Sequence, residues 1–204
     1  MIFNKAFPLR NPPLLIVITG PAGVGKDSAI KELSKHGMKF HFAITATTRP
    51  ARSNEQEGVD YFFYKEEEFE RLIKDGSLVE HDLVYGYYKG VLRDQIEPAI
   101  ARGEDVIIRP DVTGALKLRK LFPDAVLILL IPESLEQLST RLEERGTESS
   151  NEIAMRVSIA QSELSQIKQF DYVIVNRDGK LSQTASCIEA IVAAEKCRVG
   201  RYFR

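Results

Sequence analysis

The sequence predicts an α/β fold in which a parallel β-sheet is flanked by helices. Four apolar runs lack polar alternation and are rich in β-branched residues, which is typical of strands buried on both faces; they occupy 14–19, 105–108, 125–131 and 172–175. Segments with helical periodicity lie between and after them, at 28–35, 92–102, 114–122, 135–145, 152–164 and 181–196. Strands that alternate with helices form parallel sheets, because each connection must cross a face of the sheet.

The first strand leads directly into a glycine-rich turn. The segment Gly20-Pro-Ala-Gly-Val-Gly-Lys26 has the P-loop spacing G-x-x-x-x-G-K, and it lies between a buried strand and a helix as that motif requires. Glycines let successive backbone N–H groups point at one anion, and the start of the following helix adds positive potential. The turn therefore predicts a phosphate-binding loop in which Lys26 reaches the outer phosphates, with backbone contacts from Gly20, Gly23, Val24 and Gly25.

The residue after the P-loop lysine is unusual. That position normally carries Ser or Thr, whose hydroxyl binds magnesium, but here Asp27 precedes Ser28. A carboxylate repels nearby phosphates unless a cation lies between them. Asp27 therefore either holds the metal ion itself or is neutralised by another positive group. The remaining interpretation is that Asp27 only caps the helix that follows.

The region between 40 and 90 interrupts the alternation of buried strands and helices. It contains short alternating segments at 61–64, 78–81 and 83–85, together with a charged helix at 66–74. This pattern favours a small α+β insertion with an antiparallel sheet. Residues 1–13 contain three prolines and no helical periodicity, so we expect an extended N-terminal segment there.

The composition limits the kinds of partner that the chain can have. A formal net charge of −1 gives no reason to expect a polynucleotide or an anionic membrane surface. The apolar run at 14–19 is too short to cross a bilayer, and no signal-peptide cleavage pattern follows it. Cys187 and Cys197 lack metal-ligand spacing and are expected to be reduced thiols. We expect a cytoplasmic protein, either a monomer or a homodimer.

Several further segments resemble the guanylate kinases, and the likeness extends from 14 to about 191. They agree with blocks of that family in sequence, order and spacing: Thr45-Ala-Thr-Thr-Arg49-Pro-Ala-Arg52, Glu57-Gly-Val-Asp-Tyr61-Phe-Phe63, Leu78-Val-Glu80-His81, Phe122-Pro-Asp-Ala-Val126, Arg141-Leu-Glu-Glu-Arg145-Gly-Thr147 and Asp171-Tyr-Val-Ile-Val-Asn176. The resemblance implies one domain at 14–204, with a P-loop NTPase core at 14–42 and 92–196, a GMP-binding insertion at 43–91 and an arginine-bearing lid at 141–156.

The resemblance also implies a reaction and a set of site residues. The reaction is transfer of the γ-phosphoryl group of ATP to GMP or dGMP, with Mg²⁺ bound together with ATP. The ATP site would add Asp27, Ser28 and Asn176 to the P-loop, with Asp27 as the candidate metal ligand and Asn176 near the adenine. The acceptor site would comprise Thr45, Arg49, Arg52, Tyr61, Glu80, Lys89 and Asp111. The catalytic set would be Lys26, Arg49, Arg141, Arg145 and Arg156.

The chemistry of these residue types supports the implied roles independently. Two arginines three residues apart, Arg49 and Arg52, form a fork suited to a phosphate dianion. Glu80 can accept both hydrogen bonds offered by guanine N1–H and its 2-amino group, and adenine lacks this pair of donors. No general base is needed, because the acceptor phosphate is already anionic. Positioning, charge neutralisation and lid closure would supply the catalysis.

Other positions depart from the family pattern. Arg109 stands where the family has a strand-end aspartate, while Lys89 and Val91 replace a tyrosine and a hydroxyl residue. Because Asp27 and Arg109 converge on one metal site in this fold, we expect a salt bridge between them in the nucleotide-free protein. The alternative is that Asp27 ligates magnesium while Arg109 points away.

Two other functions remain open at this point. The Gly-Lys-Asp-Ser P-loop and Val91 are also similar to the ribose bisphosphate phosphokinases. The altered metal residues are compatible with a non-catalytic guanylate-kinase-like binding module. Glu80 and Asp111 would have no purpose with a ribose bisphosphate, so the sequence favours guanylate kinase activity.

Overall fold

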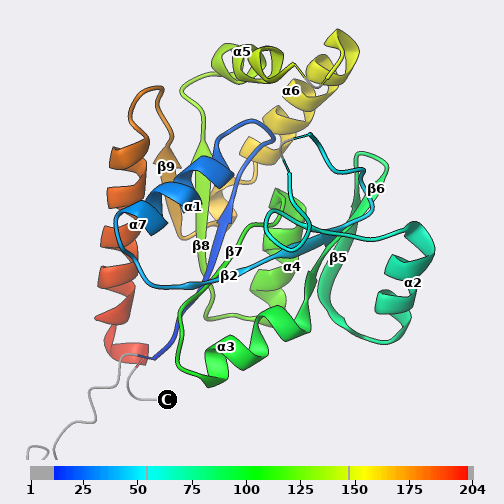
Figure 1. The fold of residues 1–204 in the computed structure, drawn as a ribbon. Coiled ribbons are helices and arrows are strands. Elements are labelled where there is room, and N and C mark those ends of the chain that lie inside the picture. The colour runs from blue at the N-terminus through cyan, green and yellow to red at the C-terminus, as the bar shows by residue number, and fades with distance from the viewer. Residues whose placement is uncertain (1–11, 54, 147, 202–204) are drawn as a thin grey trace, which may run out of the picture.

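The main sheet consists of five parallel strands (Figure 1). The structure is a computed structural model that describes residues 12–53, 55–146 and 148–201. Most of the expected N-terminal segment, 1–11, lies outside the described residues. The strand order is β2-β7-β1-β8-β9, with β1 at Leu15–Thr19, β2 at His41–Ala43, β7 at Val106–Ile108, β8 at Val126–Ile131 and β9 at Tyr172–Val175.

Strand β1 lies at the centre of this sheet and is buried along its whole length. Successive side chains of a strand point to opposite faces, so a strand covered on both sides must be apolar at every position. Ile16 and Ile18 join one core with α1 (Lys26–Lys35) and α7 (Leu181–Lys196). Leu15 and Val17 join a second core with α3 (Glu97–Ala101) and α4 (Val112–Leu121). The three-layer arrangement predicted from the sequence is confirmed.

The insertion forms a second, four-stranded sheet beside the main one (Figure 1). Its order is β4-β3-β6-β5, with β3 at Thr45–Thr47, β4 at Phe62–Phe63, β5 at Leu78–Val84 and β6 at Tyr87–Leu92. Helix α2 (Glu66–Lys74) packs on it through Phe69, whose side chain is fully buried. The β3–β6 and β5–β6 pairs are antiparallel as expected, but the β3–β4 pair is parallel.

The boundaries of the insertion differ from the predicted 43–91. Ala43 pairs with Ile108 in the main sheet, so the insertion begins one residue later. At the other end Leu92 pairs with Leu78 in the small sheet, so the helix expected at 92–102 does not start there. A 3₁₀ turn at Arg93–Gln95 and the short helix α3 occupy that stretch instead. Burial of Leu92 against Phe69 explains why it continues the strand.

Helices α5 (Leu135–Arg145) and α6 (Ser150–Leu164), which carry the predicted lid at 141–156, project beyond the main sheet (Figure 1). These two helices and their connection are called the lid below. Two further 3₁₀ turns, at Ile167–Gln169 and Val199–Arg201, precede β9 and follow α7. None of the described helices combines the length and the apolar character needed to span a bilayer.

Candidate active site

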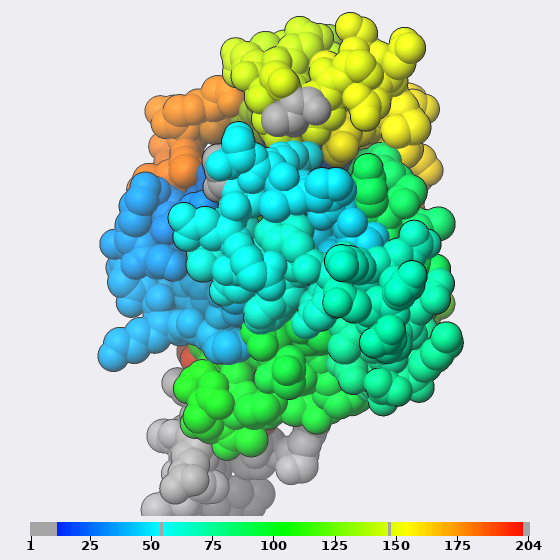
Figure 2. Space-filling model, turned by 45° about the vertical axis from the view of Figure 1, so that its right-hand side comes forward, coloured from blue at the N-terminus to red at the C-terminus, as the bar shows by residue number. Residues whose placement is uncertain are grey.

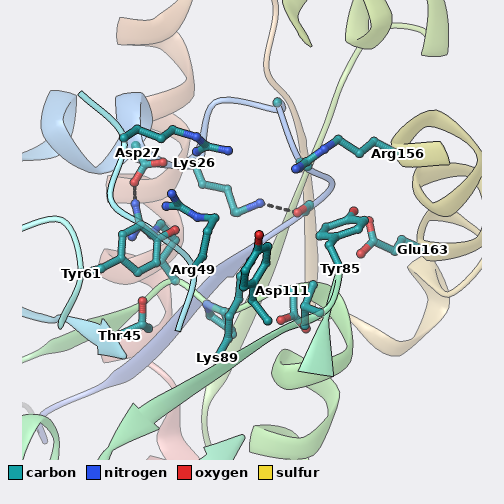
Figure 3. Close-up of a pocket in the computed structure, with 18 of the residues that line it drawn as sticks. Lys26, Asp27, Thr45, Arg49, Tyr61, Tyr85, Lys89, Asp111, Arg156 and Glu163 are labelled. Atoms are coloured by element: carbon teal, nitrogen blue, oxygen red, sulfur yellow. Dashed lines mark hydrogen bonds and ion pairs between the residues drawn. The ribbon is translucent and has the colours of Figure 1, made fainter. Parts of the chain in front are cut away.

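A cavity lies where the carboxyl ends of β1 and β7 face the insertion and the lid (Figure 3). Figure 3 shows Thr45 and Lys89 on the insertion side and Arg156 and Glu163 reaching in from α6, with Lys26 between them. Most of the site residues predicted from the sequence line this one cavity: Gly20, Gly23, Lys26, Asp27, Thr45, Arg49, Arg52, Tyr61, Glu80, Lys89, Asp111, Arg145 and Arg156.

The P-loop backbone requires glycine where it turns most sharply. Gly20 has φ 147°, and a Cβ atom there would lie 2.2 Å from the carbonyl oxygen of Leu130. Lys26 reaches back across the loop, because its Nζ donates hydrogen bonds to the carbonyl oxygens of Gly20 at 2.5 Å and Pro21 at 3.1 Å. Burial lowers the pKa of Lys26 to about 8, and the nearby Glu163 carboxylate opposes that shift. An anion in the loop would strengthen the charged form of this lysine.

The expected salt bridge between the P-loop and β7 is confirmed. Arg109 Nη1 pairs with Asp27 Oδ1, while Arg109 Nη2 donates to the carbonyl oxygen of Asp60 at 3.0 Å. The Arg109 side chain is almost fully buried, and its guanidinium carbon lies 4.6 Å from the ring centroid of Tyr61. Burial lowers the pKa of Arg109 to about 10. Arg109 therefore faces the site, in contrast to the alternative in which it points away.

Arg49 and Arg52 share one carboxylate of the insertion. Arg49 Nη2 lies 2.8 Å from both oxygens of Glu55, and the backbone N–H of Arg52 donates to Glu55 at 2.9 Å. The Arg49 guanidinium carbon lies 5.4 Å from the ring centroid of Tyr61. Lys89 is partly buried near these arginines, and desolvation lowers its pKa while Asp111 opposes the shift. The group is a cationic surface at which an anionic ligand would be stabilised.

Glu80 and Thr45 present buried oxygens at the insertion end of the cavity. Both lie next to Val91 in the strand register, Thr45 from β3 and Glu80 from β5. Glu80 Oε2 and Thr45 Oγ1 have no hydrogen-bond partner among the described residues. Burial raises the pKa of Glu80 to about 8, and the neighbouring carboxylate of Asp111 adds to the shift. Unpaired buried acceptors are costly, so their presence indicates a site for a ligand that donates hydrogen bonds.

Asp111 and Gly114 hold α4 close to Glu80. Asp111 caps α4, because its Oδ1 accepts a hydrogen bond from the N–H of Gly114 at 2.8 Å. A Cβ atom on Gly114 would lie 2.8 Å from Glu80 Oε1, so only glycine permits this approach. Asp111 thus both caps the start of α4 and lines the cavity.

The predicted lid arginines have different surroundings. Arg145 and Arg156 line the cavity, and the Arg156 guanidinium carbon lies 4.6 Å from the ring centroid of Tyr85. Arg141 instead contacts Asp178, at 2.9 Å from Nε to Oδ1, and donates to the carbonyl oxygen of Asn176 at 2.8 Å. Arg141 therefore lies beside the P-loop, with its Nη1 atom 3.3 Å from the carbonyl oxygen of Val24, and it is not among the described residues that line the cavity.

Comparison with known proteins decides the family. The family model described as Guanylate kinase matches residues 13–195.

The chain belongs to the guanylate kinase family.

Curated relatives and a solved structure agree over nearly the whole chain. Guanylate kinase of Caldanaerobacter subterraneus subsp. tengcongensis is 39% identical, covering 95% of this chain and 93% of its own length. Guanylate kinase 2, chloroplastic/mitochondrial, of Oryza sativa subsp. japonica is 42% identical, covering 94% of this chain and 68% of its own length. The crystal structure of guanylate kinase from Anaplasma phagocytophilum is 29% identical with a TM-score of 0.75, covering 93% of this chain and 89% of that one.

The side chain of Asn176 links the P-loop to helix α7. Its Nδ2 donates to the carbonyl oxygen of Val24 at 2.8 Å, and its Oδ1 accepts from Thr184 at 2.8 Å. A Cβ atom on Gly25 would lie 2.5 Å from Asn176 Nδ2, which explains glycine at that position. Ser28 is exposed near the start of α1.

Glu163 and Tyr85 are two of the cavity-lining residues that the sequence analysis did not identify. Glu163 has a buried Oε2 without a hydrogen-bond partner among the described residues, and burial raises its pKa. Tyr85 has φ 53° in the turn between β5 and β6, and burial raises its pKa to about 12. The spacing of Arg156 and Glu163, two helical turns apart on α6, was the signal that could have identified Glu163.

The donor atoms near the P-loop are compatible with a magnesium ion. Within the described ranges, no group of three or more His, Cys, Asp or Glu residues could hold a metal by itself. Magnesium that binds with a nucleotide usually takes only one or two carboxylates, with phosphate oxygens and water as its other ligands. The exposed carboxylate of Asp27, at the start of α1, has the chemistry of such a ligand.

Proposed function

We propose that this chain transfers the γ-phosphoryl group of ATP to the phosphate of GMP or dGMP, giving ADP and the corresponding diphosphate. The observation that carries the proposal is a pair of buried oxygens, on Glu80 and Thr45, that have no hydrogen-bond partner in the described part of the chain and lie in the cavity that also holds Lys26. Guanine offers two adjacent N–H donors to a carboxylate, whereas adenine, cytosine and uracil do not present that pair. A ribose bisphosphate has hydroxyl donors but lacks the adjacent N–H pair of guanine, so it is the weaker candidate.

The acceptor phosphate binds at the cationic end of the insertion in this proposal. Arg49 and Arg52 donate to it, and Tyr61 and Lys89 complete the contacts. Glu55 contacts both guanidinium groups, with its Oε1 atom 2.8 Å from Arg49 Nη2 and 3.5 Å from Arg52 Nη1. Preorganised donors of this kind reduce the entropy lost when the ligand binds.

The transfer step relies on charge neutralisation and in-line positioning. The P-loop N–H groups and Lys26 hold the donor phosphates, while Arg145 and Arg156 approach the transferring group from the lid. Arg141 would join from the donor side by exchanging Asp178 for a phosphate oxygen. No side chain needs to remove a proton, because the attacking phosphate oxygen is already anionic.

Magnesium bound with ATP is part of the proposal, with Asp27 as its protein ligand. The ion supplies charge neutralisation at the β- and γ-phosphates when bound. Asp27 would then exchange its contact with Arg109 for the ion, and the charge of Arg109 would be available to the phosphates. The small-molecule partners are ATP and GMP, while a cytoplasmic location and a monomeric or homodimeric state stay predictions.

Nucleotide turnover tests the proposed function directly. Purified protein with ATP and magnesium should form ADP when GMP or dGMP is present, and should give no more than background with AMP, CMP or UMP. Equal turnover of AMP would contradict the role of Glu80. Turnover of a ribose bisphosphate without turnover of GMP would replace the proposal with the phosphokinase alternative, and binding of GMP without any turnover would indicate a non-catalytic module.

A further inference from the structure

Glu148 lies in the short connection between α5 and α6, with its side chain only 3% exposed. Its Oε1 atom lies within salt-bridge distance of arginines from three parts of the site. Arg52 of the insertion donates to it from Nη2 at 3.1 Å, and the Nη2 atoms of Arg156 and Arg145 lie at 3.5 and 3.6 Å. One carboxylate oxygen therefore joins the insertion to both helices of the lid.

A well-formed helix end lies on each side of Glu148. Gly146 ends α5 in the left-handed conformation, at φ 65°. Ser149 begins α6 with a capping box, in which its N–H donates to Glu152 at 2.7 Å. These ends restrict where the Glu148 side chain can reach. Figure 2 shows the result at the surface, where the yellow-green and yellow lid rests against the cyan part of the insertion.

Glu148 lies behind the arginines and not in the space they line. Arg52, Arg145 and Arg156 are all among the described residues that line the cavity, whereas Glu148 is not. Three guanidinium groups gathered at one atom repel each other unless an anion lies between them. Burial and the charge of Arg49 lower the pKa of Arg52, and the carboxylates of Glu55 and Glu148 act against that shift.

We propose that Glu148 is a positioning residue for phosphoryl transfer, which gathers Arg52, Arg145 and Arg156 around one carboxylate oxygen and so couples lid closure to the acceptor site. This inference rests on the proposed function for the roles of the arginines. Glu148 is not among the described residues that line the cavity of the proposed substrates. It holds the cationic groups facing the cavity before the phosphates arrive, and it links movement of the lid to the insertion through Arg52.

The Glu148→Gln variant tests this role. Glutamine keeps the size of the side chain but removes the charge, so the arginines lose their common partner. We expect kcat to fall by about 10- to 100-fold, the scale of a small misplacement near a transferring group. KM for GMP should rise severalfold through Arg52. The Kd of ATP measured without GMP should stay within about twofold, because Lys26 and the P-loop are untouched.

Two matched variants and one ligand-free measurement complete the experiment. Glu148→Asp keeps the charge on a shorter side chain, so its kcat should fall between those of the wild type and Glu148→Gln. Glu144→Gln removes an exposed charge from α5 and should match the wild type. In ligand-free protein, amide hydrogen exchange at 145–156 should be faster in Glu148→Gln than in Glu144→Gln, because the lid has lost its contact with Arg52.

Wild-type kinetics with unchanged lid exchange in Glu148→Gln would overturn the inference. So would a loss of activity that follows only the fraction of unfolded protein. If Glu148→Gln does not fold, the Glu148→Asp variant becomes the test. A kcat of Glu148→Asp equal to that of the wild type would then overturn the positioning role of Glu148. A wild-type protein that does not turn over GMP defeats the proposed function, whereas the lid exchange measurement still tests the contact made by Glu148.

Discussion

Glu80 is a carboxylate in surroundings that disfavour its charge. It is buried, its Oε2 lacks a partner among the described residues, and its pKa is raised to about 8 by burial and by Asp111. A ligand that donates two hydrogen bonds would stabilise the charged form and lower this pKa. The cost of keeping Glu80 unpaired in the free protein is therefore recovered when the proposed guanine base binds.

The first residue-scale prediction concerns the Glu80→Gln variant. Glutamine presents an N–H toward guanine N1–H, so donors face each other and the neutral carbonyl is a weaker acceptor. The loss in GMP kcat/KM should be on the order of 2–4 kcal/mol, with little change in ATP binding. Steady-state kinetics with each substrate varied will measure it, and Glu67→Gln on the exposed face of α2 is the control. Unchanged GMP parameters would place Glu80 outside the acceptor site.

Residues carried by motifs were predictable from the sequence, and those defined by long-range contacts were not. Lys26, Arg49 and Glu80 belong to segments with characteristic spacing, and the structure brings them into one cavity. Glu148 lies 96 positions from Arg52 in the chain, and the sequence around each residue gives no signal that the two form a salt bridge. Such a contact follows only from the way the lid rests on the insertion.

At the scale of elements, the sequence predicted the long buried strands correctly but did not identify several of the short strands. The long apolar runs of β1 and β8 are distinct because helices cover both of their faces. Strands β2 and β3 are three residues each, too short to show any period, and only Ile44 separates them. The sequence alone could not show that one belongs to the main sheet and the other to the insertion.

The second prediction concerns the contact between the start of α1 and the end of β7. Asp27→Ser alone removes the carboxylate that pairs with the buried Arg109, so it should lower kcat/KM for ATP. Asp27→Ser combined with Arg109→Asp should restore or raise activity, because a hydroxyl and a carboxylate then face the metal. Coupled sites of this kind show interaction energies of about 0.5–3 kcal/mol. Additive effects in the double-mutant cycle would mean that the two residues act independently.

At the scale of the whole molecule, the core, the insertion and the lid all contribute residues to one cavity. The core supplies the P-loop, the insertion supplies the proposed guanine and phosphate contacts, and the lid supplies Arg145 and Arg156. The proposed ATP site belongs to the core and the lid, and the proposed GMP site belongs to the insertion and α4. The contacts of Glu148 are a physical link between the two sites, since they join the lid to Arg52.

This link predicts that ATP and GMP bind cooperatively. A non-transferable ATP analogue should fix the lid, and the network at Glu148 should then hold Arg52 in place before GMP arrives, so part of the ordering cost is already met. Calorimetric titration should show GMP binding about fivefold or more tightly when the analogue is present, near the lower end of common coupling factors. Because linkage is reciprocal, GMP must tighten analogue binding by the same factor. Glu148→Gln should bring both factors toward one, whereas Glu144→Gln should leave them unchanged. Equal GMP affinity with and without the analogue in the wild type would show that the two sites are independent, and that the contacts of Glu148 do not carry coupling.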